Sequence, residues 1–522
     1  MFEYPAVENA SSYELIIEEA LPGNGNPVWL TVKEHTDRSN AALISGLKFG
    51  SRYRWRVIAQ GIKGNSLSKS EPLEFTIISS PFADTTRQRL RIIRNQVSDS
   101  GLICFDFAHT IYDRSGNPVW VVPEVAGKIS DKDIVRDLRI TPQGTFTFLA
   151  TQSAFETDVD GRIRWSGVNN KAVRKNSGTD FYSTNLIRTN AGNYLTVGND
   201  AVKTVLNGGD SIVINYPYIT EYNWLGQQTW LWSSRNYFKQ EDIIENSGDG
   251  SQPYSKAFMS SISTDAKGQY VYAGFRMLNL VLKIERITGK VIAAYTGKFA
   301  NQHDVNVLGG DSLLVFNNNG NVLQNEGHSS VQLVKTGQNQ LTTLWEFDLR
   351  RDGGFSRNAE RMGNAELLPG GNILVCGGSL ARVFEVNHAK EIVWEAAPEL
   401  YDNKTKRWNE FQQSRTHYAT SLYPCYFTIR EGVRNLGKTP PYFFLTNEGT
   451  SGDTYAYTIN YQKPGEATLS VTSEITCTVD AGKEIRIILP VETHISSTGM
   501  AEVRMRSLTN PDFSRKLLVR VN

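Results

Sequence analysis

The sequence predicts an all-β fold with several domains, and three observations support this prediction. Short runs rich in Val, Ile, Tyr, Phe, Trp and Thr recur between Gly, Asn and Asp turns, whereas long helical periodicity is nearly absent. The chain has 522 residues, and at roughly 150 residues per domain this length indicates about three domains. Strand patterns also repeat through the middle of the chain, which is typical of a modular β architecture.

The first expected domain covers residues 1–79. Tyr53, Trp55 and Val57 alternate along one predicted strand, which places large side chains on one face, as in a sandwich core. The segments "YPAVENASSYEL" and "RYRWRV" resemble a fibronectin type III domain. The resemblance implies a β-sandwich at the N-terminus.

The middle of the chain contains five repeated units, which start near residues 136, 183, 259, 303 and 364. Each unit reads as four short strands, with a Gly turn after the first and an aromatic residue near the end of the fourth. A four-stranded antiparallel unit of this length has the size of a propeller blade.

A sixth unit is divided between the two ends of this region. Residues 417–424 read as a lone first strand, and residues 102–123 supply the second, third and fourth strands. Joined, they close a ring and remove the exposed edges of an open array. The sequence therefore predicts a six-bladed β-propeller over residues 80–424. Because Cys104 and Cys425 would then share a blade, a disulfide between them is an open hypothesis.

The remaining residues, 425–522, alternate with a different period and predict a second, Ig-like β-sandwich with a turn at 447–449. The fold class expected for the whole chain is thus all-β, a six-bladed propeller flanked by two sandwiches. We expect the C-terminal sandwich to support the propeller or to make contacts.

Composition narrows the classes of function. Hydrophobic residues make up 40% of the chain and charged residues 21%, as in ordinary globular proteins. The formal charge of +1 gives no reason to expect nucleic acid as the main partner. No apolar run predicts a transmembrane segment, and Met1 leads into a strand pattern without a secretory signal, so we expect a mature or trimmed chain. The four cysteines lack metal-ligand spacing, and we expect buried free thiols, no metal and no cofactor.

The repeat also predicts which residues face a ligand. In a propeller the first strands line the central channel, and the residues at their beginnings surround its mouth. Six groups occupy these positions: Arg136-Asp137, Tyr182-Ser183, Met259-Ser260, His303-Asp304, Asn364 and His417-Tyr418. His303 is therefore predicted at the channel mouth rather than on an arbitrary turn.

Several segments between residues 100 and 424 resemble the arylsulfotransferase family. They are "VYAGFRMLNLVLKIERITGKV", "QHDVNVL", "GNAELLPGGNILVCGG" and "RTHYATSLYP". The resemblance implies a propeller that transfers sulfuryl groups between phenols without a nucleotide donor, through a channel histidine assisted by other histidines and an arginine. Uncharged imidazole is a nucleophile near neutral pH, and cations stabilise the three oxygens of the transferred group.

Carried over residue by residue, the resemblance makes His303 the nucleophile or acid/base. It makes Arg276 a binder of the sulfuryl oxygens, with His417 as a second channel residue. A further set is expected to contact the ligand: Gln302, Asp304, Arg415, Tyr418, Arg361, Asn364 and Tyr182.

Simpler roles stay open for these residues. His303 could be a hydrogen-bonded turn residue, and Arg276 could pair with a carboxylate. His417 and Arg415 could simply close the ring, and Arg361 could lie solvated on its loop.

The chain departs from the family pattern at three places. Met259 stands where the family has a histidine, Phe316-Asn317-Asn318 replaces Phe-Asp-Asn, and Ser329-Ser330 replaces Ser-Arg. The methionine can neither donate nor accept a proton.

The first functional hypothesis is an arylsulfotransferase-like enzyme that moves a sulfuryl group from an aryl sulfate to a phenol. The alternatives are a catalytically degenerate propeller that binds an anionic or glycan ligand, and an extracellular scaffold. Met259 and Ser330 favour the binding alternative, whereas Gln302-His303-Asp304 favours the enzyme. The family resemblance implies a periplasmic or cell-surface location.

Overall fold

Strands dominate the structure, so the predicted all-β class is confirmed. The computed structural model describes residues 1–522 except 6, 8, 24–25, 152, 168–181, 206–210, 246–252, 320–326, 433–438, 467 and 522. The helices of the described residues are short: η2 (Ser234–Asn236), α1 (Gln240–Ile243), η3 (Arg276–Leu278), η4 (Gly378–Leu380) and η5 (Val491–Ile495). Among these residues no helix has the length and apolarity needed to cross a membrane.

The chain divides into two compact units. One contains residues 82–141 and 145–419, and the other contains residues 1–81, 142–144 and 420–522. Both predicted sandwiches thus fall in the second unit. The division into three domains with boundaries at 79 and 424 stays a prediction.

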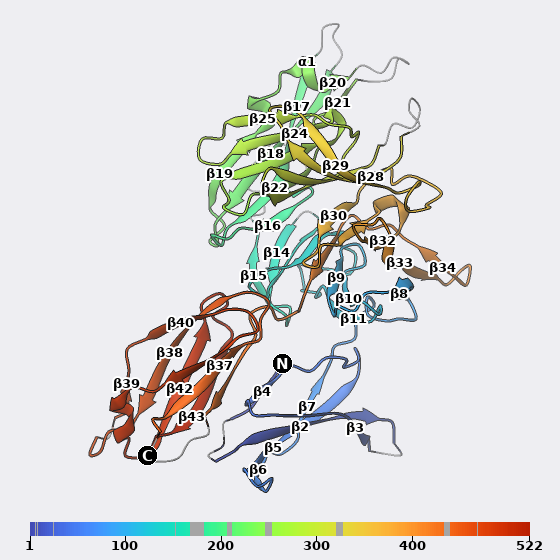
Figure 1. Cartoon of the computed structure of the whole chain (residues 1–522). Coiled ribbons are helices and arrows are strands. Elements are labelled where there is room, and N and C mark those ends of the chain that lie inside the picture. The colour runs from blue at the N-terminus through green and yellow to red at the C-terminus, as the bar shows by residue number, and fades with distance from the viewer. Residues whose placement is uncertain are drawn as a thin grey trace. The chain divides into compact units, whose positions relative to one another are not determined.

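The first unit contains six antiparallel sheets within the described residues, each one a propeller blade (Figure 1); five have four strands, and one has six because two further strands extend its four. The first blade has β12 (Val135–Ile140), β13 (Phe146–Ala150), β14 (Ser153–Thr157) and β15 (Ile163–Ser166), and the second has β16 (Leu186–Arg188), β17 (Tyr194–Val205), β18 (Ser211–Tyr222) and β19 (Gln228–Ser233). The third has β22 (Met259–Thr264), β23 (Tyr270–Phe275), β24 (Leu280–Glu285) and β25 (Val291–Tyr295), and the fourth has β26 (Asp304–Gly309), β27 (Ser312–Asn317), β28 (Ser330–Thr336) and β29 (Leu341–Asp348). The fifth has β30 (Asn364–Leu367), β31 (Ile373–Cys376), β32 (Val383–Val386) and β33 (Ile392–Asp402), and the sixth has β35 (Thr416–Ala419), β9 (Leu102–Phe105), β10 (Thr110–Asp113) and β11 (Pro118–Val121). A small pair, β20 (Ile244–Glu245) and β21 (Tyr254–Ser255), precedes β22.

Neighbouring blades touch all the way round the ring. The contacts are β35 with β12, β13 with β16, β17 with β22, β22 with β26, β26 with β30, and β30 with β35. The last blade combines both ends of the propeller segment, since β35 pairs with β9 and places His417 opposite Cys104. The predicted six-bladed propeller, including its closing blade, is confirmed.

Two strands that the sequence did not predict extend the fifth blade. β8 (Gln88–Asn95) and β34 (Arg407–Glu410) both pair with β33. Arg89 and Arg91 of β8 hold Glu399 of β33 at 2.8 and 2.6 Å. These strands lie outside the repeat, so the pattern that revealed the blades could not reveal them.

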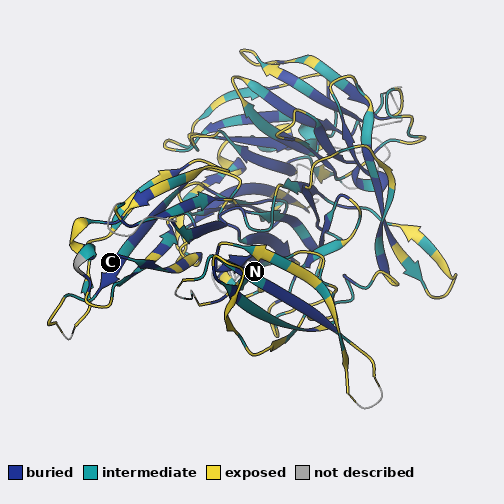
Figure 2. Ribbon diagram, turned by 60° about the horizontal axis from the view of Figure 1, so that its bottom comes forward, coloured by how far each residue is buried: buried dark blue, intermediate teal, exposed yellow. Residues whose placement is uncertain are grey.

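The inner strands of the blades are buried on both faces because each sheet packs between two others. All residues of β13 and of β31 are buried, and Figure 2 shows the blade strands largely in the dark blue of buried residues. Aromatic rings fill the space between blades. Trp120 stacks on Phe146 of the next blade at 4.1 Å, and Trp165 stacks on Tyr194 at 3.7 Å.

Charged pairs also join neighbouring blades. Three such pairs are Arg114–Glu385 (2.6 Å), Arg188–Glu156 (3.1 Å) and Arg286–Glu221. In each pair the glutamate lies on the third strand of one blade and the arginine belongs to the next blade. Each of these inter-blade arginines therefore has a buried carboxylate as its partner.

The second unit contains two groups of sheets. Its N-terminal part has β3 (Val28–Asp37), β2 (Ser12–Leu21), β5 (Arg52–Gln60), β6 (Ser66–Lys69) and β7 (Leu73–Thr76) in one sheet, and β1 (Phe2–Glu3) with β4 (Ala41–Ala42) in another. Its C-terminal part has β36 (Phe427–Glu431), β37 (Tyr442–Asn447) and β41 (Glu484–Ile488) in one sheet, and β38 (Asp453–Tyr461), β39 (Ser470–Val471), β40 (Ile475–Val479), β42 (Met500–Ser507) and β43 (Ser514–Arg520) in the other. The two C-terminal sheets share one apolar core. The fibronectin type III and Ig-like assignments stay predictions.

The expectation that Cys104 and Cys425 share a blade is wrong. Cys104 lies on β9, whereas Cys425 follows the last propeller strand and packs in the core of the C-terminal sheets. All four cysteines are free. The closing strand β35 ends at Ala419, so Cys425 lies beyond the blade that contains Cys104.

Candidate functional site

A ring of hydrogen bonds joins the beginnings of the first strands, at the end of the channel that we call the propeller mouth. Side-chain oxygens on or just before one first strand accept backbone N–H groups of the next blade. The bonds are Asp137 Oδ2 with Leu186 N (2.8 Å), Asn185 Oδ1 with Ile262 N (3.2 Å), Asp304 Oδ2 with Ala365 N (3.3 Å), and Asn364 Oδ1 with Thr416 N (2.9 Å). Asp304 and Asn364, which the sequence predicted as ligand contacts, thus fasten blades to one another.

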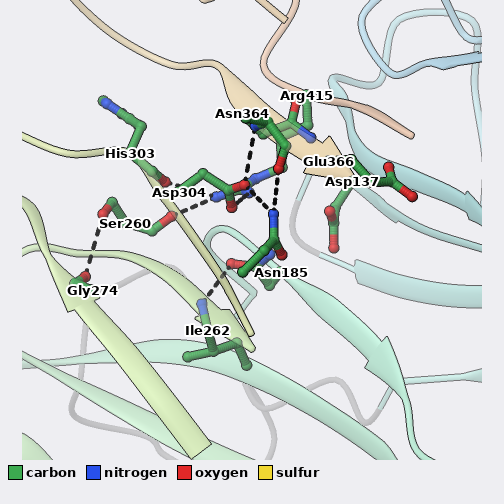
Figure 3. Close-up of polar contacts among 12 residues, drawn as sticks. Asp137, Asn185, Ser260, Ile262, Gly274, His303, Asp304, Asn364, Glu366 and Arg415 are labelled. Atoms are coloured by element: carbon green, nitrogen blue, oxygen red, sulfur yellow. Dashed lines mark hydrogen bonds and ion pairs between the residues drawn. The ribbon is translucent and has the colours of Figure 1, made fainter. Parts of the chain in front are cut away.

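Arg415 is the centre of this fastening network (Figure 3). Its side chain is 4% exposed, and Nη1 lies 2.5 Å from Asp304 Oδ1. Nη2 donates to the carbonyl oxygens of Ser260 at 2.7 Å and of His303 at 3.1 Å. The backbone N–H of Arg415 donates to Asp106 Oδ2 at 2.8 Å. Arg415 is therefore committed to contacts within the ring.

His417 lies in a second part of the same network. Its Nε2 is 2.9 Å from Asp137 Oδ1, and its Nδ1 is 3.3 Å from Glu366 Oε2. Burial and the neighbouring Arg139 oppose a charge on His417, but the bonds to the two carboxylates outweigh them and raise its pKa. For Asp137, Arg139 and His417 outweigh burial and lower the pKa. The two carboxylates thus favour the protonated form of His417.

His303 is held in the opposite state. Its Nε2 accepts the backbone N–H of Met362 at 3.2 Å, so Nδ1 carries the proton and donates it to Asn318 Oδ1 at 2.9 Å. Burial, assisted by the positive charge of Arg276, lowers the pKa of His303 to about 3. The side chain is therefore a neutral imidazole of fixed tautomer at neutral pH, and in Figure 3 it points away from the Asp304–Arg415 pair.

Asn318 orients His303, and sequence reasoning did not single it out. Its Nδ2 donates to the carbonyl oxygens of Ala359 at 2.6 Å and Met362 at 2.9 Å. Ser329 Oγ donates to the Asn318 carbonyl at 2.8 Å. The available signal was the motif Phe316-Asn317-Asn318, which keeps the amide of the family pattern at its third position. A fully buried amide anchored on two carbonyls is well suited to fix a histidine tautomer.

Arg276 and Arg361 lie beside His303 and have no carboxylate partner in the part of the chain that the structure describes. Arg276 begins η3, where its Nη2 donates to the Glu360 carbonyl at 3.2 Å. Its Nε is buried without a hydrogen-bond partner. Burial and the charge of nearby Arg361 lower the pKa of Arg276. The partly buried guanidinium of Arg276 without a carboxylate partner favours an anionic ligand, and the exposed Arg361 adds positive charge nearby.

Three other residues that were predicted to contact the ligand take part in hydrogen bonds within the propeller. Gln302 is fully buried and donates from Nε2 to two backbone carbonyls, at 3.2 and 3.0 Å. Tyr182 is buried, and its carbonyl accepts a hydrogen bond from Arg136. Tyr418 donates its hydroxyl to Asp99 at 3.1 Å. Their assignment to ligand binding stays a prediction.

The structure also shows the surroundings of the residues that depart from the family pattern. Met259 is 1% exposed and packs in the apolar core between two blades. Ser330 Oγ accepts a hydrogen bond from Asn317 Nδ2 at 3.3 Å. Across the described residues, no group of three or more His, Cys, Asp or Glu side chains is placed to hold a metal ion.

One family model matches the part of the chain that carries His303. Residues 224–399 match the model of the arylsulfotransferase (ASST) family. No curated protein matches the chain.

Several solved structures match at low identity. A protein of unknown function from Bacteroides caccae is 13% identical, with a TM-score of 0.39, and the match covers 63% of this chain and 98% of that chain. A catalytically inactive virginiamycin B lyase from Staphylococcus aureus, with quinupristin, is 12% identical, with a TM-score of 0.32 and coverage of 58% and 87%. The fold assignment rests on the strand order rather than on these matches. By the family match, the chain is arylsulfotransferase-like over the segment that carries Arg276, His303 and Arg361.

Proposed function

We propose that the propeller mouth binds an aryl sulfate and transfers its sulfuryl group to a phenol through His303. One observation carries the proposal: Arg276 and Arg361 are neighbouring cations without a carboxylate partner among the described residues, beside a neutral histidine. A sulfate monoester supplies the missing negative charge. The family match to residues 224–399 supports the same class of ligand.

The chemistry follows from the protonation state of His303. Nε2 attacks sulfur, the N–S bond forms, and the S–O bond to the aryl group breaks with departure of the phenolate. The oxygen of a second phenol then attacks sulfur, the N–S bond breaks, and its electron pair returns to Nε2. The proton of the second phenol passes to the departed phenolate or to water. Arg276 and Arg361 stabilise the three sulfuryl oxygens in both steps.

Binding without transfer is the second candidate function, and two observations favour it. The N–H of Met362 occupies the Nε2 lone pair that transfer requires. Met259 is a core residue where the family has a histidine. An anionic or glycan ligand could then occupy the mouth unchanged.

The test uses 4-nitrophenyl sulfate with an excess of phenol, and it follows the release of nitrophenolate by absorbance. We expect release by the wild type and none by His303→Ala. His328→Ala is the matched control, because His328 is another half-buried histidine of the same blade, bonded to Asp348. Calorimetric titration with 4-nitrophenyl sulfate measures binding separately. Binding without release by the wild type would select the second candidate.

We also propose a periplasmic or cell-surface location for the protein. The family likeness supports it, because an aryl sulfate donor removes the need for a cytoplasmic nucleotide donor. The sandwich parts would then support the propeller or contact a surface, as the scaffold hypothesis holds.

A further inference from the structure

We propose that Met362 is a positioning residue, whose backbone controls whether Nε2 of His303 is available, and that an anion at Arg276 makes it available. The effect of an anion at Arg276 and the consequence for sulfuryl transfer rest on the function proposed above. The control of His303 itself rests on the loop 359–362, which we call the capping loop.

The first observation is the backbone of Met362, which has a φ of +62°. For residues other than Gly, Asn and Asp this left-handed region is disfavoured by roughly five- to thirtyfold in population. The N–H of this residue is the group that donates to His303 Nε2. A strained residue therefore makes the contact that occupies the reactive nitrogen, and strain of this kind collects at functional sites.

The second observation is how the strain is held. The carbonyl of Arg361 accepts the N–H of Ser379 at 3.1 Å, and the N–H of Gly363 donates to the Ser414 carbonyl at 2.9 Å. The Met362 carbonyl accepts Asn318 Nδ2 at 2.9 Å. Fixed peptides on both sides thus keep Met362 in its unfavourable conformation.

The third observation is that Arg276, the proposed anion-binding residue, donates a hydrogen bond to the capping loop. Arg276 Nη2 donates to the carbonyl of Glu360 at 3.2 Å, two residues before Met362. An anionic oxygen is a stronger acceptor for a guanidinium than a neutral carbonyl. A sulfate group bound to Arg276 therefore competes with Glu360 for the donor that anchors the capping loop.

These contacts form one sequence of events. When the anion displaces the Glu360 carbonyl, the capping loop loses one of its anchors. The bond from the Ser379 N–H to the Arg361 carbonyl must then also break before the peptide between Arg361 and Met362 turns and φ of Met362 moves into the negative range that L residues prefer. The N–H then leaves Nε2, while Asn318 still holds the Nδ1 proton. His303 thus becomes a free nucleophile only when an anion is present.

The test measures the reactivity of His303 directly, with diethyl pyrocarbonate, which acylates neutral imidazole nitrogen. The modification rate of the His303 peptide is followed by mass spectrometry at neutral pH without ligand, relative to that of His35, whose side chain is 41% exposed, in the same sample. Met362→Gly adopts positive φ without cost and should slow the modification of His303 about fivefold. Met362→Val, whose branched side chain resists positive φ, should accelerate it. Equal rates in the three proteins, or the reverse order, would overturn the proposal.

A second variant covers the case in which Met362→Val does not fold. Arg276→Ala removes the anchor of Glu360 and should accelerate the modification of His303 in the absence of any anion. An unchanged or slower rate would contradict the proposal. This result is independent of the proposed function. If the three proteins show the expected order of modification rates but the wild type releases no nitrophenolate, the transfer reaction is wrong and the role of Met362 is still supported.

Discussion

The arginines between blades and the arginines at the mouth belong to the same propeller but have opposite surroundings. Arg114 is 5% exposed and lies 2.6 Å from Glu385, which is 3% exposed. Arg276 is also partly buried, yet the one described hydrogen bond of its side chain goes to a carbonyl, and the nearby charge that acts on it is another arginine. The chain therefore places a glutamate beside each of the inter-blade arginines, whereas Arg276 has no carboxylate partner among the described residues.

This difference separates a structural charge from a functional one. A buried cation without a counter-ion is unfavourable, and a fold keeps one when a ligand supplies the missing charge. The rule also applies to the predicted site residues. Arg415 has Asp304 as its carboxylate partner, whereas Arg276 has none among the described residues, and we therefore predict a ligand-binding role for Arg276. Arg361 is exposed, so the rule does not apply to it.

The largest expected effect comes from breaking a structural pair. Glu385→Ala leaves Arg114 buried without its closest carboxylate and should destabilise the propeller by about 3 kcal/mol. Chemical denaturation followed by tryptophan fluorescence measures this loss. Arg276→Ala is the matched comparison and should leave the midpoint nearly unchanged. An equal loss of stability in both variants would remove the distinction between the two classes.

The next effect concerns the ligand. Arg276→Ala should weaken the binding of 4-nitrophenyl sulfate about ten- to a hundredfold, because a charged hydrogen bond contributes roughly 1.5–3 kcal/mol. Titration calorimetry gives both dissociation constants, and raised salt should reduce the difference between them. Undiminished affinity in the variant would place the anion site elsewhere.

The two channel histidines should give pH dependences of opposite sign. The pKa of His303 is about 3 in the folded protein, below its ordinary value of 6.5, so the unfolded chain binds the extra proton between these values. Stability should fall as the pH drops from 6.5 toward 3, by up to about 1.4 kcal/mol per pH unit. For His417 the pKa is raised, so its stabilisation is present below pH 6.5 and is lost as the pH rises through the folded value.

Denaturation midpoints of His303→Gln and His417→Gln across this pH range test the two signs. The first variant should lose part of the acid destabilisation. It should not lose all of it, because His109, with a pKa of about 4, contributes in the same direction. The second variant should lose stability mainly at low pH. The same pH profile in both variants would contradict the assignment of one neutral and one charged histidine.

The smallest effect is expected at the strand that extends the fifth blade. Glu399→Gln weakens its bonds to Arg89 and Arg91, and because these arginines are more than one-third exposed, solvent limits the loss to about 1 kcal/mol. Hydrogen exchange of β8 amides should report it locally. Protection that is unchanged in β8 would show that backbone pairing alone holds this strand.

Much of the propeller could be predicted from the sequence because each blade repeats the same short pattern. The closing blade could be predicted too, since residues 102–123 and 417–424 each lacked what the other supplied. β8 could not, because a strand that follows no repeat has no internal copy for comparison. Its partner Glu399 lies more than 300 positions away in the chain.

The sequence predicted where His303 lies in the fold, but it could not predict which groups the residues around it contact. The repeat placed His303 at the beginning of β26, and the structure has it next to this strand. Whether Asp304 faces a ligand or Arg415 depends on side-chain contacts between blades, which no single unit of the repeat records. The same holds for Asn318 and Met362, whose contacts with His303 join separate loops.

Closure of the ring by β35 has a consequence for synthesis on the ribosome. Strands β9, β10 and β11 emerge before the four-stranded cores of the other five blades, but β35, which completes their sheet, emerges after all five. Until then β9 presents a bare edge that can pair with another nascent chain. During translation, the blade that contains β9, β10 and β11 thus stays incomplete until β35 has been synthesised. Aggregation during expression should therefore increase most when residues 416–419 are altered.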